Sequence, residues 1–356
     1  MEKFAFVIHP LSAKKDVARK YPIARLFPEP LIEKAMLLKS PIDVSHITGI
    51  KSIAGPEAEG WFVGCPLTPK LMTTLPIERV YNKIVDAVKL AEDKGAKIIG
   101  LGAFTSVVGD GGITIAERSN IAVTTGNSYT VATAIEGAKK GAEILGINPA
   151  EAVVSVVGAT GSIGKTCAAV FAKECKEVIL VGRSTDKLEA LAEEISGGKA
   201  KVSTSVDVKT GIENADIVVT VSAAVDAIIE PSFIKSGAVV CDVARPRDVS
   251  VAVQKERNDV LVIEGGVVAV PGENADLGFN FGFPPKTAYA CMSETMMLAL
   301  DGRYENFTLG KTVSVEQVET ISAIARKHGF KLAGFRSFEK AVTEETIETI
   351  LKNIKR

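Results

Sequence analysis

Residues Ala152 to Gly164 read AVVSVVGATGSIG, an apolar run that ends in three glycines spaced three residues apart. Val153 to Val157 consists mostly of β-branched residues, the pattern of a parallel strand buried on both faces. Gly158 permits a tight turn, Gly161 lets the backbone approach a pyrophosphate, and Gly164 lets the following helix pack close to the strand. Phosphates would lie at the N-terminus of that helix, where unpaired N–H groups and the dipole favour anions. The stretch therefore predicts a dinucleotide-binding turn.

The spacing of these glycines is G-x-x-G-x-x-G, whereas the standard dinucleotide fingerprint is G-x-G-x-x-G. Because of this difference, a purely structural turn between a strand and a helix remains an alternative interpretation. The residues predicted to hold the phosphates are Gly158, Thr160, Gly161, Ser162, Ile163 and Gly164.

The next apolar strand, Glu177 to Val181, indicates which dinucleotide is bound. A protein that binds NAD carries an acidic residue near the end of this strand, where it holds the ribose 2′-hydroxyl. Here the strand is followed by Arg183, Ser184 and Lys187, which suit a 2′-phosphate through charge-assisted hydrogen bonds. The sequence therefore favours NADPH. Asp186, an acidic residue close by, argues against NADPH but is interpreted as the N-cap of the following helix. The alternative interpretation of Arg183 is a solvated charge at the end of the strand.

Length and composition limit the class of protein. A chain of 356 residues is too long for one ordinary core, so two domains are expected. Its 46% hydrophobic and 24% charged residues are typical of a globular protein, and a net charge of −1 provides no field for nucleic acid. We find no apolar run that would span a bilayer and no signal peptide in MEKFAFVIHP, and therefore expect a cytoplasmic protein.

The five cysteines form no C-x-x-C pair and are odd in number. Neither a zinc site nor a disulfide framework is indicated, and no metal site is predicted. A cysteine with a role in this protein would therefore act as a thiol.

Three regions follow from the hydrophobic patterns. Residues 1–127 are expected to form an α/β domain with strands at Phe4–Ile8, Gly60–Gly64, Lys97–Leu101 and Asn120–Thr124 and a helix at Pro76–Lys94. Residues 128–286 are expected to form a Rossmann-type, doubly wound parallel sheet, with a first helix at 128–145 and strands at 153–157, 178–181, 217–221, 239–242 and 260–263. Residues 287–356 are expected to be helical, at Thr287–Leu300, Val313–His328 and Phe338–Ile354.

One candidate for the chemistry is Cys291, in PPKTAYACMSETMML. A thiol there could attack an acyl carbonyl and form a thioester for reduction by the nicotinamide. The helix is predicted to begin near Pro285, which places Cys291 beyond the first turn, where the helix dipole no longer lowers the thiol pKa. An inert cysteine buried on an apolar helix face is the alternative.

A second candidate is Lys70, in CPLTPK, which resembles the lysine that acts on a hydroxyl group in shikimate dehydrogenases. The partner motif that carries an aspartate is missing, because Gly126-Asn127-Ser128 lacks the acid. A surface lysine is the alternative.

A third candidate is a pair of loops, GLGAFTS at 100–106 and TTGNSYT at 124–130. Both follow apolar strands, so they are expected at the carboxyl end of the first sheet, where α/β proteins bind ligands. Their polar groups would donate to a carbonyl or an oxyanion, and turns and a helix cap are the alternative. The predicted substrate residues are Phe104, Thr105, Ser106, Asn127 and Tyr129.

The order and spacing of several segments resemble the long-chain acyl-[acyl-carrier-protein] reductases of cyanobacteria. The similarity runs from about Phe4 to Phe330 and includes VSHITG, EGWFVGCPLTPKLM, GLGAFTS, TTGNSYT, GATGSIG, AYACMSETMMLAL and KHGF. The resemblance implies NADPH-dependent reduction of a fatty acyl thioester to a fatty aldehyde through an acyl-enzyme on a cysteine. That cysteine's motif, Phe-Ala-Cys followed two residues on by Ala-Glu-Ser, matches Tyr289 to Thr295 and makes Cys291 the predicted nucleophile.

The resemblance also has limits. Tyr129 occupies the position of a family histidine, and the helix expected at Phe338–Ile354 has no counterpart. The acyl carrier would be acyl carrier protein, coenzyme A or neither. Glu294 would act as a base or lie on the helix surface, with the surface position favoured. An apolar channel for the acyl tail is expected to be lined by Phe104, Met292, Met296 and Met297. The alternative is that the methionines belong only to the hydrophobic core.

Two other functions remain open. One is an oxidoreductase acting on a small hydroxy acid, similar to shikimate dehydrogenase, with Lys70 as the working residue. The other is a regulatory protein that binds NADPH without catalysis.

Overall fold

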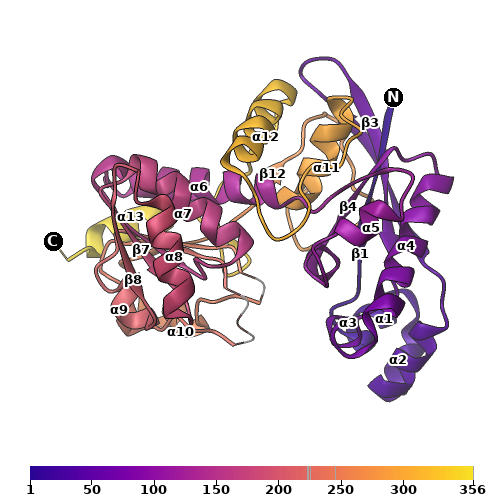
Figure 1. Ribbon diagram of the computed structural model, residues 1–356, viewed down its shortest axis with the longest axis horizontal. Coiled ribbons are helices and arrows are strands. Elements are labelled where there is room, and N and C mark those ends of the chain that lie inside the picture. The colour runs from indigo at the N-terminus through magenta and orange to yellow at the C-terminus, as the bar shows by residue number, and fades with distance from the viewer. Residues whose placement is uncertain (223, 225, 245, 356) are drawn as a thin grey trace. The chain divides into compact units, whose positions relative to one another are not determined.

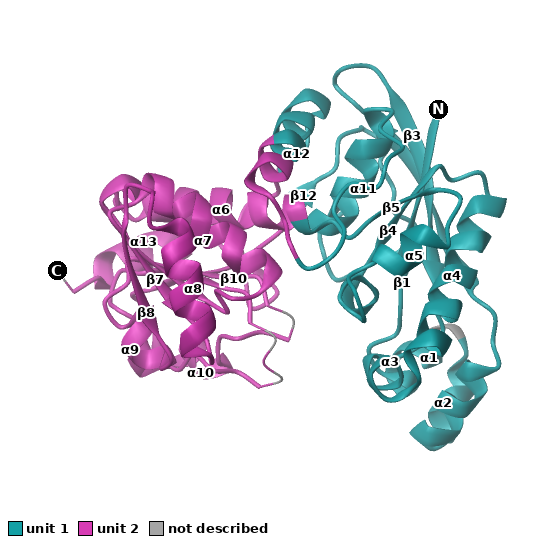
Figure 2. Ribbon diagram, in the orientation of Figure 1, with its two compact units in different colours: residues 1–127, 268–311, 320–331 teal, residues 128–267, 312–319, 332–356 magenta. Residues whose placement is uncertain are grey.

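The computed structural model describes all residues except 223, 225, 245 and 356, and omits the side chains of Arg19 and Lys20 (Figure 1). The chain divides into two compact units (Figure 2). Unit 1 comprises residues 1–127, 268–311 and 320–331, and unit 2 comprises residues 128–267, 312–319 and 332–356. Each unit is built around its own mostly or wholly parallel sheet, which confirms the α/β fold predicted from the sequence.

The sheet of unit 1 has five strands in the order β2-β3-β1-β4-β5. Four of them are parallel and were predicted, whereas β2 is an antiparallel edge strand that the sequence did not predict, because most of its side chains are exposed or only partly buried. The strands are β1 (Glu2–Ile8), β2 (Ile42–Lys51), β3 (Glu57–Gly64), β4 (Ile98–Leu101) and β5 (Ala122–Thr124).

One face of this sheet packs against the amphipathic helix α4 (Ile77–Asp93). Its buried residues Val80, Ile84 and Val88 recur at four-residue spacing, as an amphipathic helix requires. The shorter helices of unit 1 are α1 (Ala13–Lys20), α2 (Glu29–Leu37), α3 (Pro69–Thr74) and α5 (Ile113–Glu117), with 3-10 turns at Pro22–Leu26 and Ala103–Ser106.

Helix α11 (Ala290–Leu300) contacts β1, β3 and β4 and is buried on all sides beyond Cys291. Gly100 of β4 makes room for this packing. A Cβ at Gly100 would lie 2.2 Å from the Thr295 hydroxyl oxygen and 2.3 Å from the Phe6 ring, so no larger residue fits. The helix is therefore part of the core of unit 1 and not of a separate C-terminal region.

The sheet of unit 2 has six parallel strands in the order β11-β10-β9-β6-β7-β8. This is the 3-2-1-4-5-6 order of dinucleotide-binding domains, whose order reverses between β6 and β9. The strands are β6 (Val153–Val157), β7 (Glu177–Val181), β8 (Lys201–Ser205), β9 (Ile217–Thr220), β10 (Val239–Asp242) and β11 (Leu261–Glu264). Only β8 was not predicted, because this edge strand, KVSTS, is polar.

Both faces of the second sheet are buried, because alternate side chains enter two different clusters. Val219 and Cys241 belong to one cluster, and Val218 and Val240 belong to the other. The helices around the sheet are α6 (Asn127–Ile144), α7 (Ser162–Glu174), α8 (Thr185–Ile195), α9 (Val208–Ile212), α10 (Val251–Glu256) and α13 (Glu344–Asn353), with 3-10 turns at Pro149–Glu151 and Pro231–Phe233.

The C-terminal part of the chain differs from the prediction for residues 287–356. Residues 287–289 form a strand, β13 (Thr287–Tyr289), in a small sheet with β12 (Val267–Ala269) and β14 (Lys331–Leu332). Helix α12 (Val315–His328) is present, but the predicted helix at Phe338–Ile354 is shorter. A hairpin of β15 (Arg336–Ser337) and β16 (Lys340–Ala341) precedes α13, with φ of 47° at Phe338 and 68° at Glu339, as its two-residue turn requires.

Over the described part of the chain, no helix has both the length and the apolar character needed to cross a membrane.

Candidate functional site

The turn after β6 requires glycine at two positions for reasons of packing. Gly158 has φ of 81°, and a Cβ there would lie 2.9 Å from the backbone of Ser222. A Cβ at Gly164 would lie 2.3 Å from the Gly158 carbonyl oxygen. At Gly161 the nearest atom would be 3.3 Å away, so the protein itself restricts this position less.

The N-terminus of α7 has the features of an anion site. Its N-cap is Gly161, and no side chain caps the helix. The hydroxyl oxygen of Ser162 is buried and has no hydrogen-bond partner among the described residues, an arrangement that costs free energy unless a ligand supplies one. A phosphate group would accept from this hydroxyl and from the N–H groups of the first turn. Thr160 and Ile163, the other predicted residues here, are partly exposed.

Beyond β7, the predicted cations are available to a ligand. Arg183 and Lys187 are exposed, and neither forms an ion pair with any described residue. Ser184 is the N-cap of α8, and its side chain makes no capping hydrogen bond. The interpretation of Asp186 as the N-cap was therefore wrong: it lies in the first turn, where its charge favours the helix dipole.

A buried carboxylate that the sequence did not reveal organises the ends of β9 and β10. Asp248 is 0% exposed and accepts hydrogen bonds from the Thr220 hydroxyl, from the Ser222 backbone N–H at 3.0 Å and from the Ser222 hydroxyl at 2.5 Å. Ser222 is also the residue against which Gly158 packs. This network therefore fixes the loop beside the Gly158 turn, at the point where the strand order reverses.

Cys291 is the second residue of α11, whose N-cap is Tyr289. The prediction that it lies beyond the first turn was wrong, because residues 287–289 form β13 and the helix begins only at Ala290. Cys291 thus lies where the helix N-terminus favours negative charge.

Of the five cysteines, all of them described, Cys291 alone is partly exposed. Even so, burial raises the pKa of its thiol to about 12, and the negative charge of Glu294 raises it further, against the lowering effect of backbone N–H groups. The resting thiol is therefore protonated at neutral pH.

Gly126, in the predicted loop TTGNSYT, packs directly on Cys291. It has φ of 76°, and a Cβ there would lie 2.3 Å from the Cys291 Cα and 2.4 Å from its Cβ. The partly exposed Asn127 follows immediately in the chain. The structure thus brings this loop to the predicted nucleophile.

Glu294 is buried in the core, so its predicted position on the helix surface was wrong. It is 0% exposed, and its carboxylate accepts from the hydroxyls of Thr124 at 2.6 Å and Thr308 at 3.0 Å. Thr308 in turn joins the end of β5, since its N–H donates to the Thr124 hydroxyl and its carbonyl accepts from the Thr125 N–H. Thr308 belongs to no sequence motif, and only the fold reveals it.

The loop GLGAFTS forms a tight 3-10 turn. The hydroxyls of Thr105 and Ser106 are mostly buried and donate to Gly102 and Ala103 carbonyls of the same turn, at 2.8 Å and 2.7 Å. The Phe104 N–H donates to the His9 ring at 3.0 Å. Burial lowers the pKa of His9, which keeps the ring neutral and able to accept.

The remaining predicted residues are buried, except for Lys70, which forms an exposed ion pair. Tyr129 is 3% exposed in α6, and burial raises the pKa of its hydroxyl. Met292, Met296 and Met297 are buried, which confirms that they are core residues. Lys70 pairs with Glu33 at 3.0 Å, and its side chain is 66% exposed.

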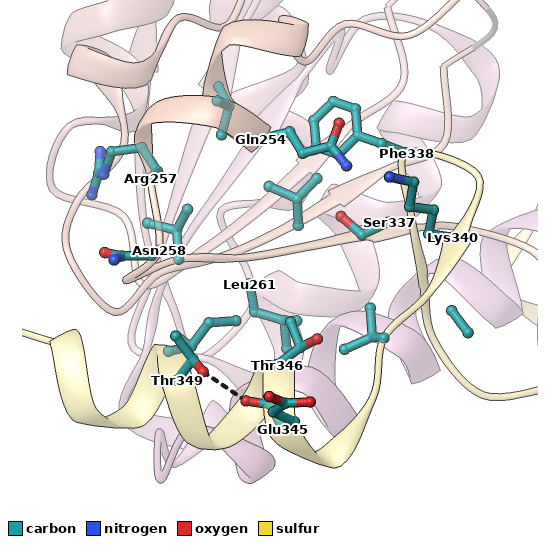
Figure 3. Close-up of a pocket in the computed structure, with 16 residues that line it drawn as sticks. Gln254, Arg257, Asn258, Leu261, Ser337, Phe338, Lys340, Glu345, Thr346 and Thr349 are labelled. Carbon is teal, nitrogen blue, oxygen red and sulfur yellow. Dashed lines mark hydrogen bonds between the residues drawn. The ribbon is translucent and has the colours of Figure 1, made fainter.

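A hollow of about 420 Å³ in unit 2 lies between α10, β11, the β15–β16 hairpin and α13 (Figure 3). Gln254 lines it from α10, and Phe338 and Lys340 line it from the hairpin. It contains none of the residues predicted to bind the cofactor or the substrate.

Comparisons with known proteins found a family match and a distant structural similarity. Residues 139–264 match the sequence model of the shikimate / quinate 5-dehydrogenase family, a segment that includes the Gly158 turn but neither Lys70 nor Cys291. The chain is also similar, at 17% identity and a TM-score of 0.30, to YhdH of E. coli K-12, solved with bound NADPH, with 39% of this chain and 43% of that chain covered.

Two curated relatives cover most of the chain. Aminotransferase PigE of Serratia sp. (strain ATCC 39006) is 29% identical over 301 residues, which span 84% of this chain but only 35% of that protein. The long-chain acyl-[acyl-carrier-protein] reductase of Synechococcus elongatus (strain ATCC 33912 / PCC 7942 / FACHB-805) is 27% identical over 306 residues, 81% of this chain and 86% of that protein. The reductase relative, the dehydrogenase match and the strand order of unit 2 together support an NAD(P)-dependent oxidoreductase, without selecting one member.

The contact between Gly126 and Cys291 predicts a specific loss of stability. Gly126→Ala introduces both a strained φ and a clash with backbone, whereas Gly302→Ala, at φ of 69° in the same unit with no atom within 4 Å, introduces only the strain. We expect urea denaturation to show a loss of about 1–2 kcal/mol for Gly302→Ala and at least ~1–3 kcal/mol more for Gly126→Ala. Equal losses would contradict the close packing.

The charge of Glu294 predicts a change in thiol reactivity. Glu294→Gln removes the negative charge that raises the pKa of Cys291, while an amide oxygen still accepts from Thr124 and Thr308. The thiol pKa should fall, so alkylation by iodoacetamide at a fixed, mildly alkaline pH should become faster than in the wild type. Glu305→Gln, which removes an exposed charge elsewhere in unit 1, should leave the rate unchanged. Unaltered alkylation in Glu294→Gln would contradict the electrostatic coupling.

Proposed function

We propose that this chain reduces a fatty acyl thioester to a fatty aldehyde, with NADPH as reductant and an acyl-enzyme on Cys291. The proposal depends above all on the position of Cys291: a partly exposed residue in the first turn of a helix, packed against a loop at the carboxyl end of the parallel strands of unit 1. The similarity to the Synechococcus reductase, which extends over 81% of this chain, supports the same chemistry.

Unit 2 fits NADPH through groups that have no partner in the described part of the chain. The first turn of α7 and the buried Ser162 hydroxyl would hold the pyrophosphate, and Arg183, Ser184 and Lys187 would hold the 2′-phosphate. When bound, NADPH supplies a hydride to the acyl carbon.

The residues of unit 1 account for the acyl transfer. Cys291 loses its proton and attacks the thioester carbonyl, and the carrier thiolate leaves and takes up a proton, so that one thioester replaces another. The N–H groups in the first turn of α11 favour the negative charge that develops on the carbonyl oxygen. Hydride and a proton then convert the acyl-enzyme to an aldehyde and restore the Cys291 thiol.

Among the residues predicted for the substrate, Asn127 is the best placed. It is partly exposed and follows Gly126, which contacts Cys291. The hydroxyls of Thr105 and Ser106 serve their own turn, so in this proposal they shape the loop around Phe104 and do not bind substrate.

The family match supports a second candidate, an oxidoreductase acting on a small hydroxy acid. The matched segment, 139–264, contains the dinucleotide-binding turn. In this alternative Lys70 would act on a hydroxyl group, and no covalent intermediate would form. The Lys70 side chain is largely exposed, and its ammonium group pairs with Glu33.

Acylation in the absence of NADPH distinguishes the two candidates. Incubation with palmitoyl-coenzyme A should give an acyl adduct in the intact mass, and Cys291→Ala should abolish both the adduct and aldehyde formation. Cys65→Ala, which removes a buried thiol of the same unit, should retain both. Full reductase activity in Cys291→Ala would rule out the acyl-enzyme, and loss of a hydroxy acid dehydrogenase activity in Lys70→Ala would favour the second candidate.

The choice of NADPH is tested at the end of β7. Arg183→Ala should weaken NADPH binding about 10- to 100-fold, the effect of losing a hydrogen bond to a charged group, and leave NADH binding nearly unchanged. Lys176→Ala, at the opposite end of the same strand, should affect neither cofactor. Equal weakening of both cofactors, measured by titration, would remove Arg183 from the 2′-phosphate site.

A further inference from the structure

The segment before Cys291 presents an unusual series of aromatic side chains. Phe279, Phe281 and Phe283 alternate with small or polar residues in GFNFGFPP, and Tyr289 follows them. We call residues 279–289 the aromatic loop. No helix and only the short strand β13 lies within it, so secondary structure does not account for this alternation.

The rings form one continuous cluster. Phe279 and Phe281 lie 4.6 Å apart between ring centroids, and Phe283 and Tyr289 are also 4.6 Å apart. Phe281 joins the two pairs, with its centroid 6.1 Å from Tyr289, and packs on the buried Phe62 at 5.1 Å. These separations are those of favourable aromatic contacts. The four loop rings are nevertheless only partly buried, so apolar area remains exposed.

The segment just before the aromatic loop, residues 274–278, is held firmly against β2. The backbones of Thr48 and Asp276 exchange two hydrogen bonds of 2.9 Å. A Cβ at Gly49 would lie 2.0 Å from the Asn274 carbonyl oxygen, so the two segments approach as closely as glycine allows. The loop is therefore anchored where it begins.

Two hydrogen bonds tie the exposed polar side chains of this part of the chain to its own backbone. The Asp276 carboxylate accepts from the Gly278 N–H at 2.8 Å, and the Asn280 side chain accepts from the Gly282 N–H at 2.7 Å. The same segment lines an open hollow of about 420 Å³, to which Phe279, Phe281 and Phe283 contribute. This volume is within the range of small-molecule sites.

The far end of the loop leads directly to the predicted nucleophile. Tyr289 is the N-cap of α11 and is separated from Cys291 by a single residue. Phe281 and Phe283 both contact the Tyr289 ring. The chain that carries Cys291 thus continues directly from a partly exposed aromatic surface, whereas the methionines of α11 are enclosed in the core.

We infer that the aromatic loop binds the hydrocarbon chain of the acyl group and sets the preference for long chains. The inference rests on the proposed acyl transfer to Cys291 and adds the residues that select the substrate. Each methylene that leaves water for an apolar surface strengthens binding about fourfold, so a site of this kind separates long from short chains steeply.

The rate of Cys291 acylation tests this inference. It is followed by intact mass with butyryl-, octanoyl- and palmitoyl-coenzyme A in the full chain. In the wild type the rate constant should rise with chain length. In the double variant Phe281→Ala, Phe283→Ala the butyryl rate should stay within about twofold of the wild type, while the palmitoyl rate should fall about tenfold or more.

Two controls separate binding from folding. Phe281→Leu keeps an apolar side chain at this position and should retain most of the palmitoyl preference. This single variant still tests the inference if the double variant does not fold. Phe27→Ala removes an exposed ring of the same unit outside the loop and should change nothing. An equal loss for all three thioesters, or an unchanged palmitoyl preference, would overturn the inference.

A binding measurement separates this inference from the proposed function. If no thioester acylates the wild type, the proposed acyl-enzyme fails. The loop is then tested in Cys291→Ala by the fluorescence anisotropy of a fluorescent palmitate analogue. Its affinity should fall about tenfold when Phe281 and Phe283 are also replaced by Ala. Unchanged affinity would overturn the assignment of the loop.

Discussion

The close packing of α11 against the sheet of unit 1 is the constraint on which the candidate site depends. Glycine at 100 lets the helix approach β4, and glycine at 126 lets the loop after β5 lie on the backbone of Cys291. The buried carboxylate of Glu294 then joins the helix to Thr124 and Thr308. Because the helix is held at its N-terminus and one turn further on, the thiol has a fixed position, and the surrounding burial raises its pKa.

Unit 2 differs, because its candidate binding groups have no partner within the residues that the structure describes. The uncapped N-terminus of α7, the buried hydroxyl of Ser162 and the unpaired Arg183 all lie next to the carboxyl ends of β6 and β7. The Asp248 network, in contrast, is fully bonded and holds the loop after β9 in place. A rigid scaffold with unsatisfied groups at one edge is what a preformed anion site requires.

Sequence patterns predicted those parts of the fold that are driven by continuous burial. The strands at Val153–Val157 and Val239–Asp242 agree with the structure residue by residue, because a strand buried on both faces has an unmistakable apolar run. The edge strands β2 and β8 escaped prediction, since exposed or polar edges lack that run. The start of α11 was misplaced because Pro284 and Pro285 suggest a helix start, whereas pairing with β12 makes residues 287–289 a strand.

For the candidate site, the sequence by itself determined the chemical types: a glycine turn for phosphates, cations after the next strand, and a cysteine in a helical segment. Only the tertiary structure decided where the cysteine lies in its helix, that Glu294 is buried, and that Thr308 and the aromatic loop accompany them. The physical reason is that local patterns report local backbone preference and burial, whereas the contacts of Glu294 and Thr308 join α11 and residues 306–308 to β5, which is far away in the chain. Their energies depend on distances that no local pattern encodes.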